Sequence, residues 1–230
     1  NTTASDNVAV GNQALDTNTT GANNVAVGAN ALDANTTASN NTAVGKSALK
    51  LNTTGVNNVA VGALSSDSCT TGYNNVAIGN EALSSLTTGN SNVAIGRAAL
   101  ANFDNNDNTA VGAYSLQTAT NGHNNVAVGG YSMYNTTSGV FSAAVGRSAM
   151  GGNTTGGYNA AVGYFALAAS QTSNFSVAVG YLALRHSTVG SNTAIGAESL
   201  QTNTTGTYNV AVGRKSLDDN TTGNNQTAIG

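Results

Sequence analysis

Hydrophobic residues return along the chain in a five-residue phrase, typified by Asn24-Val25-Ala26-Val27-Gly28, at an almost fixed interval. The phrase ends in glycine fourteen times, and successive glycines are 17 residues apart except for two intervals of 16. A repeat of this length has no room for a helix pair, and one repeat cannot bury its own apolar face, so neighbouring repeats must stack. The pattern predicts an all-β protein, a β-solenoid or parallel β-roll of about fourteen coils with 16–17 residues each.

Within the phrase, the residue before the glycine is always Val or Ile, the one before that is always Ala, and the third back is Val, Thr or Ala. This alternation predicts a strand with the Val/Ile column in the coil interior and the Ala column on the reverse face. A face open only to water gives no reason for alanine in every copy. We therefore predict a second surface against the Ala column, either another chain or another part of the same coil. The candidate inter-chain packing residues are Ala9, Ala26, Ala43, Ala60, Ala77, Ala94, Ala110 and Ala127.

After each glycine come two variable residues, then Ala or Ser, then in most copies Leu or Met, as in Ala14-Leu15. This segment predicts a second short strand, whose Leu fills the interior opposite the Val/Ile column. The fourth coil departs from the pattern because Ser66 occupies the Leu position. A local bulge or a small cavity is expected there.

Polar residues mark a corner of each coil, in phrases such as Asn18-Thr19-Thr20-Gly21 followed by the pair Asn23-Asn24. Gly and Asn accept positive φ, which suits them to tight corners. Stacked Asn and Thr side chains can also hydrogen-bond from coil to coil. We interpret these polar rows as structural ladders in preference to a ligand site.

The same corner carries N-glycosylation sequons. Eleven Asn residues precede x-Ser or x-Thr, and six of them lie seven residues after a repeat glycine. On an export route with the appropriate transferase, these could carry a row of sugars. The alternative is that a chain rich in Asn and Thr forms sequons by chance and leaves them bare. The six corner candidates are Asn18, Asn35, Asn52, Asn153, Asn203 and Asn220.

Composition removes several classes of function. Charged residues make up 7% of the chain and its net charge is −3, so the basic footprint of a nucleic-acid-binding protein is absent. No apolar run approaches the length of a membrane span. The single cysteine, Cys69, excludes an intrachain disulfide and is interpreted as a tolerated free thiol, with an intermolecular bridge as the alternative.

Catalytic and metal-binding patterns are missing as well. His123 and His186 occupy different columns in distant coils, with no carboxylate or cysteine cluster at ligand spacing. No nucleophile elbow, zinc-protease or phosphate-loop motif is present. We therefore predict no catalytic, metal or cofactor site, and a chain that is not an enzyme.

Residues 1–230 are predicted to form a single solenoid domain. Because neither end carries a polar capping repeat, we expect a segment of a longer fibre or a subunit that joins end to end.

Phrases such as Asn24-Val25-Ala26-Val27-Gly28-Ala29-Asn30-Ala31-Leu32 resemble the head repeats of trimeric autotransporter adhesins, the YadA-like family. They are also similar to repeat arrays in phage tail fibres. The resemblance covers essentially the whole chain, although the coil here is longer by its Asn-Thr-Thr-Gly corner. It implies a left-handed parallel β-roll with two short strands per coil, a homotrimer packed about a threefold axis, and attachment to host or matrix surfaces.

The predicted function is therefore that of a structural or adhesive fibre at a cell or virion surface, which self-associates and meets a host, matrix or carbohydrate surface. The alternatives are a glycosylated filament built end to end, an ice-binding solenoid and a carbohydrate-processing enzyme. The ice-binding alternative is motivated by the Thr column of Thr19, Thr36, Thr53, Thr70 and Thr87. Adjacent Thr residues are expected to point to opposite faces, which leaves a single outward file, and that file is broken at Asp104 and Gln171. The enzyme would need paired carboxylates in one groove, and the column of Asp16 and Asp33 continues as Lys50.

Overall fold

The computed structural model describes residues 4–230, which form fourteen three-residue strands and no helix. Every strand is the segment immediately before a repeat glycine, and turns and bends make up the rest of each coil. The prediction of an all-β solenoid is confirmed. The chain divides into two compact units, residues 1–114 and 115–230, and each is described by itself.

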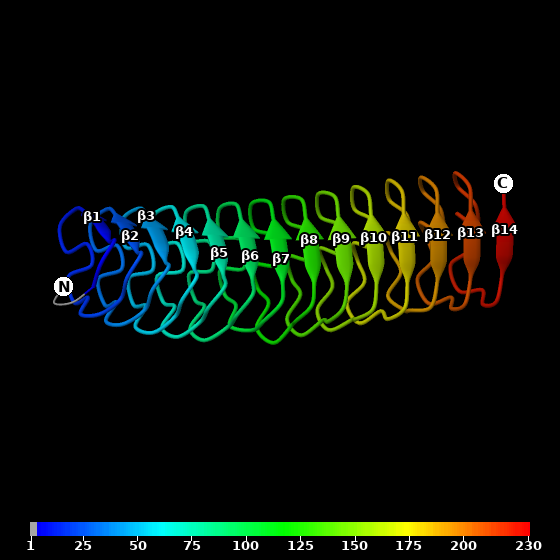
Figure 1. Ribbon diagram of the computed structural model, residues 1–230. Coiled ribbons are helices and arrows are strands. Elements are labelled where there is room, and N and C mark those ends of the chain that lie inside the picture. Colours follow the sequence, from blue (N-terminus) through cyan, green and yellow to red (C-terminus); the bar gives the residue numbers. More distant parts are fainter. Residues whose placement is uncertain (1–3) are drawn as a thin grey trace. The chain divides into compact units, whose positions relative to one another are not determined.

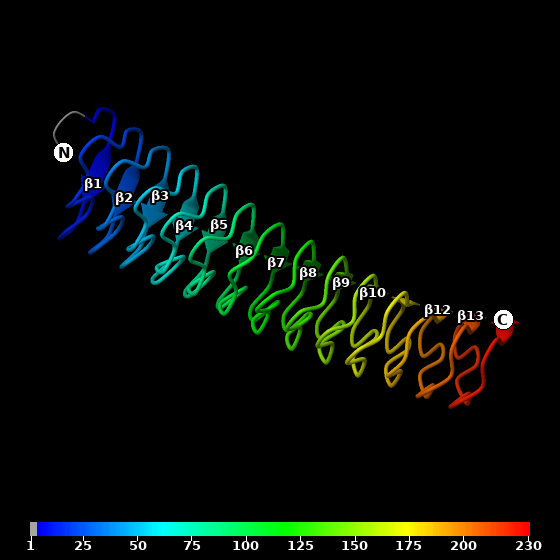
Figure 2. The ribbon, with the colours of Figure 1, turned by 90° about the horizontal axis from the view of Figure 1, so that it is seen from below.

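Within each unit the strands pair in parallel and in chain order (Figure 1). Each residue pairs with its counterpart one coil further on, so Ala26 lies beside Ala43 and Ala160 beside Val177. Figure 2 shows the successive coils of each unit lying next to one another. The first unit contains β1 (Val8–Val10), β2 (Val25–Val27), β3 (Thr42–Val44), β4 (Val59–Val61), β5 (Val76–Ile78), β6 (Val93–Ile95) and β7 (Thr109–Val111). The second contains β8 (Val126–Val128), β9 (Ala143–Val145), β10 (Ala160–Val162), β11 (Val177–Val179), β12 (Thr193–Ile195), β13 (Val210–Val212) and β14 (Thr227–Ile229).

The Ala column faces the coil interior, and the Val/Ile column faces outward, which reverses the predicted orientation of the strand. Ala60 is fully buried, whereas Val59 and Val61 on either side of it are partly exposed. Inside most coils the strand alanine shares the space with a turn Leu and with Asn side chains, such as Leu32 and Asn35. A coil this narrow leaves room for little more than a methyl group at the strand centre.

The Ala residues therefore pack against another part of their own coil, which was one of the two predicted partners. Their prediction as an inter-chain packing face is wrong for seven of the eight, because a side chain with no exposed surface cannot contact another chain. Ala9 is exposed. The fully buried residues are Ala26, Ala43, Ala60, Ala77, Ala94, Ala110 and Ala127.

The segment after the glycine is not a second strand, so each coil has one strand and the prediction of two is wrong. Leu32 is buried as predicted, but its φ is 50°, and Asn30 two residues earlier has a φ of 60°. Left-handed residues two positions apart produce successive turns and prevent an extended strand. Coil-to-coil hydrogen bonds still continue here, because the Leu32 N–H donates to the Ala48 carbonyl at 3.0 Å.

The strand of the fourth coil keeps its register with its neighbours. The local bulge, which was one of the two features expected in this coil, is absent. Ser66 lies in the Leu column with 2% of its surface exposed, and its N–H donates to the Ala82 carbonyl at 2.8 Å. Leu64 lies two positions earlier and is more than one-third exposed. β4 and β5 pair residue for residue past this coil, so the exchange of Leu and Ser changes the packing without shifting the strands.

In one of the two shorter repeats, a carboxylate side chain replaces a backbone carbonyl as the hydrogen-bond acceptor between coils. In a coil of normal length, the Thr71 N–H donates to the Thr87 carbonyl one coil on. In the next step Asp104 Oδ1 takes the place of that carbonyl and accepts the N–H groups of Thr87, Thr88 and Gly89 at 3.0, 2.8 and 3.0 Å. The Thr87 hydroxyl donates to the other carboxylate oxygen. Burial raises the pKa of the Asp104 carboxyl, but these four hydrogen bonds outweigh it and hold the pKa below its ordinary value.

The lowered pKa predicts a local loss of stability in acid. The Asp104 carboxylate contributes stability above its unfolded pKa, and this contribution disappears as the pH falls through the lower folded value, below about pH 4. We expect amide protection at Thr88 and Gly89 to fall in that range, as measured by hydrogen exchange relative to intrinsic rates. The Thr53 amide, which donates to a backbone carbonyl, is the internal control. In Asp104→Asn the side-chain oxygen can still accept N–H groups but does not titrate, so the protection should not fall in acid, and a wild-type response in that variant would contradict the assignment.

Candidate interaction surface

The most extensive feature open to a partner is the outward side of the strands, here called the outer strand face. It comprises the first and third residue of every strand, that is, the two columns that flank the buried alanines. In the first unit Ile78 and Ile95 are 38% and 37% exposed, and in the second Val145 and Val162 are 40% and 43% exposed. All fourteen strands consist of Val, Ile, Thr and Ala alone. The face is therefore apolar and uncharged within each unit.

Such a surface has a physical consequence. A sheet stabilises a protein by burying apolar side chains, and one face of each sheet already does so against the coil interior. The other face presents β-branched side chains in rows at the spacing of adjacent strands, about 4.8 Å. Extended apolar patches on a soluble protein mark interaction sites. The outer strand face thus replaces the Ala column as the candidate inter-chain surface.

The corner that carries the sequons forms an Asn ladder inside the coil, which confirms the predicted side-chain ladders. Asn35 Nδ2 donates to Asn18 Oδ1 at 2.9 Å and to the Ala38 carbonyl at 3.1 Å. One coil on, Asn52 Nδ2 donates to Asn35 Oδ1 at 3.1 Å. These amides satisfy carbonyl groups that the corner would otherwise bury without a partner.

The ladder removes this corner as a glycosylation surface in the folded chain. Five of the six candidates, Asn18, Asn35, Asn52, Asn153 and Asn203, are buried with at most 1% of their surface exposed. In each of them Nδ2, the atom that would carry the glycan, donates to a carbonyl three residues on. Asn220 is half-buried and makes the same bond at 3.2 Å. The predicted row of sugars at these positions is wrong, because a glycan would displace the hydrogen bond and has no space. Sequon residues on the surface are Asn40, Asn135, Asn174 and Asn225, and Asn1 lies outside the described residues.

A second buried Asn column lies four residues before the repeat glycine. The Asn24 side chain accepts the Asn41 N–H at 2.9 Å and donates to the Ala38 carbonyl at 2.8 Å. The Asn58 N–H bonds to Asn41 in the same way. Each Asn therefore joins neighbouring coils through both its oxygen and its nitrogen, which makes these residues structural and leaves them unavailable to a ligand.

In the first unit the corner Asn ladder ends and apolar residues continue its column. Cys69, Leu86 and Phe103 occupy successive positions after Asn52, and all three are fully buried. Cys69 is a free thiol, and burial raises its pKa to about 11. The nucleophilic thiolate is therefore scarce at neutral pH, which agrees with an inert thiol and disfavours a bridge to another chain.

In most Thr pairs both residues reach the surface, so the expectation that they point to opposite faces is wrong for those pairs, and Thr136 is a buried exception. The first Thr is partly exposed and its hydroxyl bonds to the next coil, as Thr53 does to the Thr70 carbonyl at 3.0 Å. The second, such as Thr54 or Thr71, is exposed. The corner is a bend and not a strand, so adjacent side chains do not alternate.

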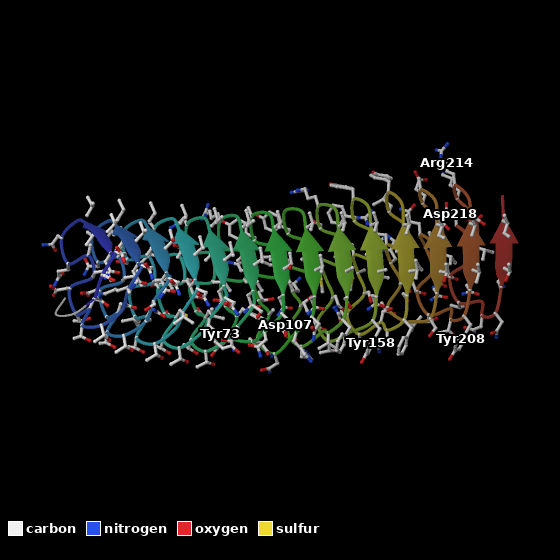
Figure 3. All side chains as sticks on the ribbon, viewed as in Figure 1. Tyr73, Asp107, Tyr158, Tyr208, Arg214 and Asp218 are labelled. Atoms are coloured by element: carbon white, nitrogen blue, oxygen red, sulfur yellow. The ribbon has the colours of Figure 1, made fainter. Side chains whose placement is uncertain are left out.

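Aromatic side chains form a separate feature in the second unit. Phe141, Tyr158 and Phe175 stack on one another from coil to coil. Tyr158 and Tyr208 lie along the lower edge in Figure 3, whereas Arg214 and Asp218 lie along the upper edge. Sequence analysis missed the stack. The signal was present, because the three stacked residues are 17 positions apart.

No group of three or more His, Cys, Asp or Glu side chains within residues 4–230 is arranged to hold a metal ion. Over the same residues, no helix is long and apolar enough to cross a membrane. Comparison with known proteins found no matching family model, no matching curated protein and no matching solved structure.

Proposed function

We propose that this chain is a structural and adhesive module of an extracellular fibre, at a cell or virion surface, and that it self-associates through the outer strand face. The observation that carries the proposal is the uncharged row of exposed Val, Ile and Thr side chains on that face. The partner is a second copy of this chain, because a second copy repeats the same columns at the same spacing. Rows of one copy can then pack between rows of another along each unit.

Two further features support a mechanical role. Backbone hydrogen bonds join neighbouring coils in each unit, and buried Asn side chains add further bonds between coils where both coils supply an Asn, so few polar groups of the corner are left to bind a small molecule. The resemblance to head repeats of trimeric adhesins supports a homotrimer, with binding by avidity from many equivalent coils. The inter-chain contact lies on the Val/Ile side of each strand and not on the Ala side.

We expect native mass spectrometry to find a discrete species at three times the 22.7 kDa chain mass. The triple variant Val61→Lys, Ile78→Lys and Ile95→Lys places three charges on the outer strand face of the first unit. Burying unpaired ammonium groups in an interface is strongly unfavourable, so this variant should be monomeric at micromolar concentration. The strand backbone is unchanged, and circular dichroism should retain its β signal.

The matched control is Thr37→Lys, Thr54→Lys and Thr71→Lys, which adds the same charges in the same unit on the exposed Thr file. This control should assemble as the wild type does. A wild-type chain that is monomeric at micromolar concentration, or a control that dissociates as readily as the face variant, would contradict the proposal. An open-ended series of masses would indicate filaments built end to end in place of a closed trimer.

An ice-binding solenoid is the second candidate, and one observation favours it. The outer Thr file of the first unit is exposed in five successive coils and ends at Asn105; its members are Thr20, Thr37, Thr54, Thr71 and Thr88. Thermal hysteresis in the wild type that disappears in the Thr-to-Lys control above would favour this candidate over adhesion.

A further inference from the structure

A file of aromatic rings follows one edge of the second unit, at the position five residues before the repeat glycine. The rings of Phe141 and Tyr158 have centroids 5.3 Å apart and planes inclined by 16°, and those of Tyr158 and Phe175 are 5.1 Å apart and inclined by 13°. The three side chains are 48%, 52% and 65% exposed. These rings form a continuous platform in solvent and contribute little to the core.

The backbone at these positions is unfavourable for aromatic residues. Phe141, Tyr158 and Phe175 have φ values of 51°, 60° and 57°, in the left-handed region. Most other coils have Asn at this position, for example Asn57 and Asn124, and Asn tolerates the conformation far better than an aromatic residue. An aromatic residue in this conformation is strained. Because the rings gain so little burial, their placement indicates a ligand.

The file lacks one ring, and a hollow occupies that place. Ser191 stands at the same position between Phe175 and Tyr208, and these three residues line a hollow of about 340 Å³ together with Thr172, Asn174 and Thr207. Two coil steps separate the flanking rings by about 10 Å, given the usual strand spacing. A flat six-membered ring inserted midway would lie about 5 Å from each neighbour, close to the spacing between Tyr158 and Phe175.

The chemistry of the lining selects among flat rings. Aromatic faces form the two walls, whereas Ser191, Thr172, Thr207 and Asn174 present hydroxyl and amide groups, and no charged side chain takes part. A pyranose has C–H groups on its faces and hydroxyl groups around its edge. The C–H groups can pack against the electron-rich faces of the rings, and the hydroxyls can bond to the polar rim. An aromatic side chain would pack against the walls but would form no hydrogen bonds through its ring edge with the hydroxyl groups of the rim.

A second hollow extends the surface beside the platform. Ala143 and Ala160 stand where most other strands have Val or Thr, and together with Phe141, Tyr158, Val126 and Val177 they line a depression of about 530 Å³. Its lining is also uncharged. We propose that the aromatic file of the second unit is a binding site for neutral glycans, with one pyranose held between Phe175 and Tyr208 and further units along the platform.

This inference rests on the proposed adhesive function, for which it names a ligand class. The aromatic file lies outside the strands, whereas the depression beside it includes the first residues of β8 to β11 and so belongs to the outer strand face. The test measures the binding of cellohexaose, chitohexaose and mannohexaose by isothermal titration calorimetry. We expect at least one of them to bind. Ser191→Phe fills the missing place in the file, and Tyr208→Asn removes one wall while installing a residue that this position accepts elsewhere. Each variant should weaken binding at least about tenfold, which corresponds to about 1.4 kcal/mol, because Tyr208→Asn removes a ring contact and Ser191→Phe fills the slot.

Matched controls are available in the first unit. Ser91→Phe makes the same substitution at the same coil position, but Asn74 and Asp107 flank it there. Tyr73→Asn removes an exposed tyrosine that is outside the file. Both should leave binding unchanged, and thermal unfolding followed by circular dichroism should confirm that all four variants are folded.

The inference is overturned if none of the three oligosaccharides binds at millimolar concentration, or if Ser191→Phe and Ser91→Phe have equal effects. Equal binding of a hexamer of galacturonic acid would overturn the preference for neutral glycans. Native mass spectrometry of the same samples tests the proposed self-association independently of glycan binding. Trimers that bind no glycan would refute the site alone, whereas glycan binding by a wild-type monomer would refute the self-association.

Discussion

Gly163→Ala is expected to lower the free energy of unfolding of the second unit by about 4 kcal/mol, the sum of backbone strain and overpacking. Gly163 has a φ of 136°, a conformation that residues with a Cβ rarely adopt. A Cβ at this position would lie 2.3 Å from the Gly180 carbonyl oxygen and 2.6 Å from the Gly180 carbonyl carbon. Neither atom can move, because each belongs to the backbone of the next coil. Urea unfolding followed by circular dichroism would measure the loss.

Gly151→Ala is the matched control in the same unit. Its φ lies outside the left-handed region, and the nearest atom to an added Cβ is the Ser148 carbonyl oxygen at 3.2 Å. We expect this variant to change the stability by less than about 1 kcal/mol. Equal losses of stability in Gly151→Ala and Gly163→Ala would mean that close contact between neighbouring coils is not the reason why the repeat position requires glycine.

The period and the position of the strand were predictable because both follow from spacing. A glycine every 16 or 17 residues fixes the length of a coil, and alternation around Ala26 or Ala60 identifies the strand. Alternation could not predict which side chains of the strand face the coil interior, since the same pattern is compatible with either the Ala residues or the Val and Ile residues pointing inward. The width of the coil decides, and it admits the methyl group of Ala60 but not the side chain of Val61.

The prediction of a second strand after the glycine was wrong for a different reason. The Ala-Leu pair reads as a short apolar run, and residues such as Leu32 rarely have positive φ. Sequence propensity therefore favours a strand there. In the structure the coil-to-coil hydrogen bond of Leu32 and the burial of its side chain override that preference.

The sequons illustrate how a motif can point away from the structure. Asn18, Asn35 and Asn52 match the acceptor pattern, but a sequon describes only three residues and says nothing about burial. The neighbouring coils carried the missing information, because Leu86 and Phe103 stand in the same column. A column that accepts Leu and Phe in place of Asn is a buried column, and reading across coils would have identified it.

Phe103→Ala is expected to destabilise the first unit by about 3–5 kcal/mol, the usual range for removing a buried aromatic side chain. Phe103 has no exposed surface and is among the largest fully buried side chains of the chain. Its removal forfeits the burial of the ring and leaves a cavity that the stacked coils, which are held by hydrogen bonds on both sides, cannot close. Tyr73→Ala in the same unit is the control, and because Tyr73 is 46% exposed, its effect should be within about 0.5 kcal/mol.

Phe103→Asn separates two explanations of this column. If the position requires Asn wherever the chain allows it, the variant should restore a ladder and approach the stability of the wild type. If the column instead needs its interior filled, the introduced amide would face Leu86, whose side chain cannot accept or donate a hydrogen bond, and the loss should equal or exceed that of Phe103→Ala. We expect the second result, because Leu86 in the preceding coil offers no acceptor of the kind that Asn18 offers to Asn35.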